Sequence, residues 1–136
     1  MLRRIAIAAA LSLTLAAPAA AAPAEVGQYV DILPVGLPVV SHGQLVNYVF
    51  VYLRLNLAPN ADALRLREKE PYFRDALVRS AHRSPFSVPG DVNRIDDSRL
   101  CAAMMREAAA IVGPGVVRSV VVTSQAPQHR LANPRS

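Results

Sequence analysis

Few of the residues that commonly do chemistry in proteins lie close together in this sequence. The three histidines, His42, His82 and His129, are far apart, and none has a metal-ligating partner at a short, regular spacing. A zinc site and a catalytic triad both need such partners. No G-x-S-x-G, P-loop or dinucleotide-binding glycine pattern occurs in the chain. We therefore expect no metal, no cofactor and no enzymatic activity.

Two acidic residues and a cysteine have simpler explanations than catalysis. Asp96 is a good N-cap for a following helix, and Asp97 suits the positive end of that helix. Cys101 follows Leu100 in an apolar helical stretch, which favours a buried structural thiol over a nucleophile. It is the only cysteine in the chain and cannot form an internal disulfide.

Residues 1–24 have the order of a secretory signal peptide: a pair of arginines, a short apolar run and then small residues. Cleavage fits after Ala21 or after Ala24, and export places the mature protein in the periplasm. The alternative is an uncleaved membrane anchor, although the apolar run is shorter than the ~20 residues that span a bilayer. Twin-arginine export stays open, but the missing polar and aromatic neighbours of the pair favour Sec export.

The exported part has the size of one small domain, which can bury a core without disulfides or metal. The formal net charge of the whole chain is +5, and two of its arginines belong to the signal peptide. The remaining charges are interspersed, without a run of like sign, which argues against nucleic acid as a partner.

Two strand-like segments, residues 29–40 and 45–57, surround a turn and predict a β-hairpin. The first contains Pro34 and Pro38, which cannot donate a hydrogen bond to a neighbouring strand. We therefore expect it to be an edge strand or a bulged strand. The second alternates with a period of two, as a sheet with one packed face requires.

The two faces of the second strand differ in chemistry. One face is aliphatic and carries Val49, Val51, Leu53, Leu55 and Leu57. The other carries Tyr48, Phe50, Tyr52, Arg54 and Asn56. Alternating aromatic residues can form a stacking platform for single-stranded nucleic acid. An exported protein meets little nucleic acid, so we expect these aromatic residues to pack against a helix.

Two helical segments, residues 61–70 and 72–82, flank Pro71, and Asn60 is a plausible N-cap for the first. Proline inside a helix costs about 3 kcal/mol but is tolerated in the first turn. The sequence therefore predicts a break or a kink at this proline.

The rest of the chain completes one small α+β domain, residues 25–125, in the order β-β-α-α-α-β. A loop over residues 84–95 leads to a helix that ends at Val112 before Gly113, and a Val-rich strand follows over residues 116–123. We expect a flexible tail over residues 126–136.

Four segments carry a resemblance to a known family: Tyr29-Val30-Asp31-Ile32, the strand from Tyr48 to Leu53, the charged segment from Arg67 to Leu77, and the closing strand from Val116 to Gln125. Over these segments the chain resembles the periplasmic domain of the FliL family, the flagellar basal-body-associated proteins. The resemblance implies a fold similar to the stomatin/prohibitin (SPFH) domain and assembly around the flagellar stator. The family keeps a transmembrane helix where this chain has a short Ala-rich segment. We therefore expect a FliL-like offshoot whose membrane contact is peripheral at most.

Two classes of function follow from these observations. The first is a non-enzymatic periplasmic accessory or scaffold protein that binds envelope proteins, with the flagellar stator or a second copy as partner. The second is a small periplasmic binding module for anionic lipid head groups or wall polymer. For the first class we expect the contact in a mixed-charge helical surface formed by Arg65, Arg67, Glu68, Glu70 and Arg74. The alternative interpretation is that these residues form a solvated helix face without a partner.

Overall fold

A computed structural model describes residues 27–134 of the chain, and the predicted signal peptide lies outside them. The elements follow in the order β1 (Tyr29–Ser41), β2 (Gln44–Leu57), α1 (Ala63–Glu68), α2 (Glu70–Arg83), β3 (Ser87–Val88), β4 (Asp91–Ile95), α3 (Asp97–Val112) and β5 (Val117–Pro127). The predicted α+β class is confirmed, with a β-hairpin, helices and a closing strand in one small domain. The short β3–β4 hairpin lies where the sequence predicts a loop.

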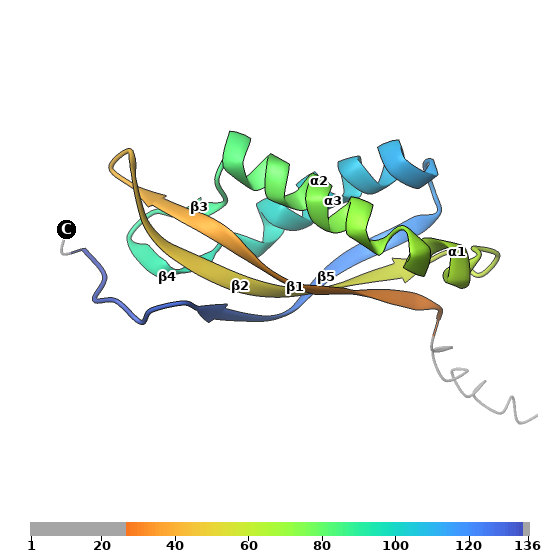
Figure 1. Ribbon diagram of the computed structural model, residues 1–136, viewed down its shortest axis with the longest axis horizontal. Helices are drawn as coiled ribbons and strands as arrows, with labels where there is room; N and C mark the ends of the chain where they lie inside the picture. Colours follow the sequence, from red (N-terminus) through yellow and green to blue (C-terminus); the bar gives the residue numbers. More distant parts are fainter. Residues whose placement is uncertain (1–26, 135–136) are drawn as a thin grey trace, which may run out of the picture.

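The three long strands form one antiparallel sheet in the order β1-β2-β5, so β2 is the central strand (Figure 1). β1 lies at an edge, as its prolines predict. The pairing of β1 with β2 shifts between Ile32 and Val35, which leaves Leu33 and Pro34 in a bulge. A bulge at an edge is a position where a residue without an N–H group is tolerated.

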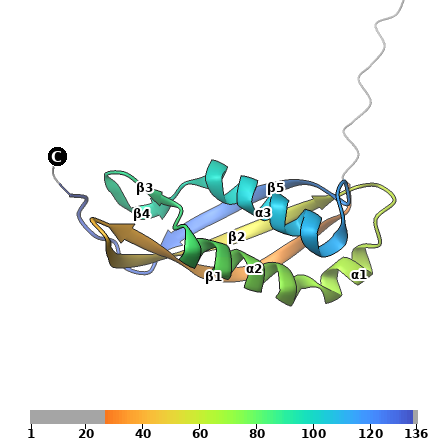
Figure 2. The same ribbon diagram turned by 90° about the horizontal axis from the view of Figure 1, so that it is seen from above.

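Helices α2 and α3 lie side by side on one face of this sheet (Figure 2). The aliphatic face of β2 points toward them, and each of its five predicted core residues is at most 3% exposed. The largest helical side chains in this core are also fully buried: Phe73, Leu77, Leu100 and Met104. The domain is therefore two layers, with its core between the helix pair and the sheet.

The helical conformation is interrupted between α1 and α2, and Pro71 lies in the first turn of α2. Lys69 both ends α1 and precedes α2, because its backbone N–H still donates to the α1 carbonyls while its own carbonyl accepts from the first turn of α2. The two-helix interpretation of this proline is confirmed.

The predicted cap at Asn60 is wrong, because the helix begins two residues later. Asp62 is the N-cap of α1, and its side chain accepts a hydrogen bond from Arg65 N at 3.1 Å. Asn60 instead lies in a turn that Ala61 N closes by donating to Ala58 O. The predicted cap of α3 is correct, since the Asp96 side chain accepts from Arg99 N.

The β3–β4 hairpin packs near the turn end of the sheet, where a buried asparagine holds it. Asn47 on β2 donates through Nδ2 to Val92 O of β4 at 3.0 Å and to His129 O at 2.8 Å. Its Oδ1 accepts from Tyr48 N and His129 N. One side chain therefore joins the central strand, the hairpin and the segment after β5.

The segment after β5 continues along the domain rather than leaving it at once. Gln128 N donates to Tyr48 O at 2.7 Å, and Leu131 exchanges hydrogen bonds with the Asn93 side chain. Asn133 Oδ1 accepts from Val92 N at 3.0 Å. Much of the segment predicted as a flexible tail thus belongs to β5 or is hydrogen-bonded to β2 and β4.

Candidate interaction surface

The face of the sheet turned away from the helices is uncovered by any other element of residues 27–134 (Figure 1). It carries four large side chains that are 40 to 56% exposed: Leu33, Phe50, Tyr52 and Val121. We call these four residues, with Tyr29, Asp31 and Arg54, the open face. The prediction that the aromatic residues of β2 pack against a helix is therefore wrong. Both long helices cover the aliphatic face, which leaves the aromatic face without a helix.

The strand register brings the residues of the open face together. Asp31, Arg54 and Val121 form one row across the three strands, and Gly36, Phe50 and Ala126 form another. The bulge places Leu33 between these rows, next to Tyr52, where a hollow of about 290 Å³ lies. Side chains that are far apart in the sequence therefore form one continuous surface on rigid strands.

The Phe50 ring lies over a glycine of the neighbouring strand. A Cβ atom added to Gly36 would be 3.3 Å from Phe50 Cε1, closer than ordinary van der Waals contact. Because Gly36 has no side chain, the Phe50 ring can lie closer to β1 than it could if a larger residue stood at position 36. This packing limits the conformations of an exposed aromatic side chain, which lowers the entropy lost when a partner covers it.

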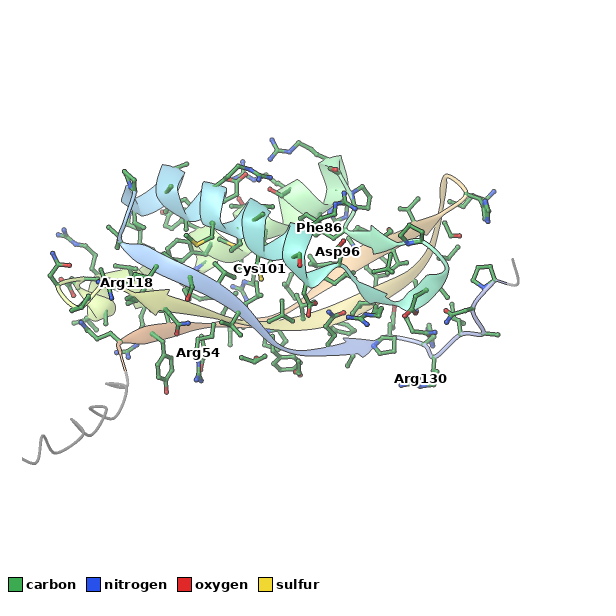
Figure 3. The ribbon with its side chains drawn as sticks, turned by 180° about the vertical axis from the view of Figure 1, so that it is seen from behind. Arg54, Phe86, Asp96, Cys101, Arg118 and Arg130 are labelled. Atoms are coloured by element: carbon green, nitrogen blue, oxygen red, sulfur yellow. The ribbon has the colours of Figure 1, made fainter. Side chains whose placement is uncertain are left out.

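A bidentate ion pair lies beside the apolar part of the open face. Arg54 Nε donates to Asp31 Oδ1 at 2.7 Å, and Arg54 Nη2 donates to Asp31 Oδ2 at 3.1 Å. The guanidinium also lies 3.8 Å from the centre of the Tyr29 ring. The hydrogen bonds from Arg54 lower the pKa of Asp31 below its ordinary value of 3.8. Figure 3 shows Arg54 on the side of the sheet opposite α3 and Cys101.

Three of the five predicted contact residues lie on α1 and are exposed: Arg65, Arg67 and Glu68. Arg65 and Glu68 line a shallow hollow at the junction with α2, together with Lys69 and Tyr72. The Lys69 ammonium lies 5.4 Å from the centre of the Tyr72 ring. Part of the predicted surface is thus free for a partner.

The other two predicted contact residues hold the domain together. Glu70 Oε1 accepts a hydrogen bond from Leu33 N at 3.0 Å, which satisfies a backbone donor in the β1 bulge. Arg74 Nη2 lies 3.6 Å from Glu70 Oε2, and the Glu70 side chain is only 12% exposed. The first residue of α2 is therefore tied to the edge strand, a role that the charge pattern of the helix does not reveal.

Gln125 on the closing strand β5 also satisfies backbone groups of a neighbouring element, as Glu70 does. Gln125 Oε1 accepts from Ile95 N at 2.9 Å, and its Nε2 donates to Ile95 O and to Asp97 Oδ1. The amide therefore pairs with the end of β4 as a backbone group would. It links β5 to the start of α3.

Cys101 is half-buried between α3 and β5 and packs against the core. Burial raises the pKa of its thiol above the ordinary value of 9.0, and the nearby charge of Asp97 raises it further. Both effects reduce the thiolate fraction near neutral pH, which makes the thiol a poor nucleophile.

The described residues, 27–134, show neither a metal-binding cluster nor a membrane-spanning helix. No group of three His, Cys, Asp or Glu side chains there could hold a metal ion. None of the helices there combines the length and the apolar character needed to cross a membrane. No model of a known protein family matches the sequence, and no curated protein matches it either. The resemblance to the FliL family stays a prediction from the sequence.

Proposed function

We propose that this chain is a non-enzymatic accessory or scaffold protein of the periplasm, FliL-like, that binds another envelope protein through its open face. The observation that carries the proposal is the cluster of Leu33, Phe50, Tyr52 and Val121, each at least 40% exposed, on three adjacent strands. Contiguous exposed apolar patches on small soluble domains mark interaction sites.

The composition of the open face favours a protein partner. Tyrosine, phenylalanine and arginine are enriched where protein interfaces bind most strongly. Arg54 is already paired with Asp31, so a partner can cover this surface without leaving an unpaired charge. The strands hold the side chains in fixed positions, which lowers the entropic cost of association.

The resemblance to the FliL family makes the flagellar stator the leading partner. Deletion of the gene should then reduce motility, and a fraction of the protein should sediment with membranes. The second class of function, binding of anionic lipid or wall polymer, predicts intact motility and salt-sensitive binding to anionic vesicles.

Two double variants test the open face against a matched surface. Phe50→Ser with Tyr52→Ser removes aromatic area from the open face. Leu64→Ser with Tyr72→Ser removes similar area from the helical side, where these side chains are 67% and 63% exposed. Capture of stator and other envelope proteins after cross-linking in cells should fall at least about tenfold for the first variant only.

The melting temperatures of both double variants should stay near that of the wild type, because the exchanged side chains lie outside the core. Equal capture by the wild type and the Phe50/Tyr52 variant would reject the open face as the contact surface.

A further inference from the structure

A cleft of about 320 Å³ lies between the last turn of α2 and the first turns of α3, on the helical side of the domain. Its polar lining consists of three arginines, two serines and one glutamate: Arg83, Arg99, Arg106, Ser80, Ser84 and Glu107. It is separate from the open face, because it lies in the helical layer on one side of the sheet and the open face is the other side of the sheet (Figure 1).

The hollow exists because of two small residues on α3. Arg99 and Arg106 are two helical turns apart, about 10 Å along the axis, and project toward the same side. Ala102 and Ala103 lie between them and fill little space. Phe86, which is 4% exposed, closes the floor of the cleft. The two guanidinium groups therefore flank an open space rather than a packed side chain.

The charges in the cleft do not balance. Its one carboxylate, Glu107, is already engaged, because Glu107 Oε1 accepts from Ser80 Oγ at 3.1 Å and from Arg83 Nη2 at 3.4 Å. Among the described residues, the Arg99 guanidinium donates only to a carbonyl, from Nη2 to Pro85 O at 3.3 Å. In the described part of the chain, no ion pair includes Arg99 or Arg106. The cleft thus presents two arginines without a counter-charge.

We propose that this cleft binds a phosphate group, carried by a lipid head group, by a phosphodiester polymer or by free phosphate. The planar guanidinium fork matches phosphate oxygens in pairs. The oxygens of a phosphate are arranged tetrahedrally, so donors can approach it from both helices, whereas the two oxygens of a carboxylate lie in one plane. The exposed Ser84 hydroxyl adds a neutral donor. Arg99 lies in the first turn of α3, whose positive end also favours an anion.

The size of the cleft sets what it can hold. Pockets that enclose a whole small ligand range from about 300 to 1,000 Å³. A cleft at the lower end of this range fits one head group, with the rest of the molecule outside. This site goes beyond the proposed contact through the open face, since it lies on a different surface of the domain. It gives the second class of function, binding of anionic lipid or wall polymer, a specific place in the fold.

The primary test is a titration of the exported protein with inorganic phosphate, against chloride at matched ionic strength, followed by backbone amide chemical shifts. We expect saturable shifts confined to residues 80–86 and 99–107. Arg99→Gln with Arg106→Gln should weaken binding at least about tenfold, because it removes two charged donors. Arg118→Gln with Arg130→Gln is the control, since it makes the same change in net charge away from the cleft (Figure 3).

Vesicles identify the source of the phosphate. Co-sedimentation with phosphatidylglycerol vesicles but not phosphatidylcholine vesicles, reduced in the Arg99/Arg106 variant alone, assigns the site to a lipid head group. Binding of inorganic phosphate without vesicle binding assigns it to a free or polymer-borne phosphate.

The single variant Arg106→Gln keeps the test valid if the double variant unfolds. The Arg106 side chain makes no hydrogen bond or ion pair with the described residues, so its replacement should leave the melting temperature unchanged. Absence of both phosphate and vesicle binding would overturn the proposal. Equal weakening in the Arg99/Arg106 and the Arg118/Arg130 variants would also overturn it, because the effect would then follow from net charge alone.

Discussion

At the scale of single residues, Asn47 is a buried polar side chain that joins the β3–β4 hairpin to the central strand. It is 4% exposed and makes hydrogen bonds to Val92, His129 and Tyr48. The sequence places it on the aliphatic face of β2, where only apolar residues are expected. A polar residue at such a position can be recognised from the sequence only as an exception to the pattern, and its partners cannot be named.

Replacement of Asn47 by leucine should reduce the free energy of unfolding by about 2–4 kcal/mol, because buried donors and acceptors are left without partners. Asn56→Leu is the matched control on the same strand. Its side chain donates one hydrogen bond, from Nδ2 to Ser119 Oγ at 2.9 Å, and is only partly buried. We expect the control to cost less than about 1 kcal/mol in urea unfolding. Equal losses at the two positions would contradict the role of Asn47.

The thiol of Cys101 should react slowly in the folded protein. Its raised pKa lowers the thiolate fraction at pH 8, and half-burial limits access to the sulfur. With a disulfide reagent such as dithionitrobenzoate, the rate should be lower for the folded chain than for the chain in urea. It should keep rising as the pH passes 9.0, the ordinary pKa of the thiol. An equal reaction rate in the folded and the unfolded chain would show that folding neither buries the thiol nor raises its pKa.

At the scale of elements, the break between α1 and α2 sets the position of Glu70, and through it the contact with the β1 bulge. Pro71 lies in the first turn of α2, where a backbone N–H group would have no hydrogen-bond acceptor within the helix, so its absence costs nothing. Pro71→Ala should therefore change the free energy of unfolding by less than about 1 kcal/mol.

Arg79→Pro is the contrasting variant for this helix. It places proline at an exposed position in the second half of α2, where it should cost about 3 kcal/mol or more. Both variants are compared by urea unfolding. Stabilisation of more than about 1 kcal/mol by Pro71→Ala would mean that the proline strains one continuous helix.

The long elements could be predicted from the sequence because their patterns are local. The period of two in β2 and the cap at Asp96 both predict structure from neighbouring residues alone. The β3–β4 hairpin could not be predicted in this way, because its strands are short and depend on Asn47 and Gln125, both far away in the chain. The sequence does not identify the true cap of α1, because Asn60 and Asp62 are both good N-caps, and the turn at Ala58 selects the second.

At the scale of the whole molecule, the sequence indicates that β2 has two different faces but not which elements cover them. In residues 27–134, three long strands and two long helices make only two layers, so one face of the large sheet stays open there. Leu33 joins this face through a bulge, and Val121 joins it through the pairing of β5, neither of which the alternation in β2 predicts. The predicted mixed-charge surface is divided, because Glu70 and Arg74 serve the packing of α2 against β1.

The central claim, association through the open face, is tested most directly by a photo-cross-linking amino acid placed at Tyr52, Arg67 or Tyr72 in the native host. All three positions are exposed, but only Tyr52 lies on the open face. We expect a specific adduct with an envelope protein from position 52 and none from position 72. An adduct from position 67 alone, or none from position 52, would contradict the central claim.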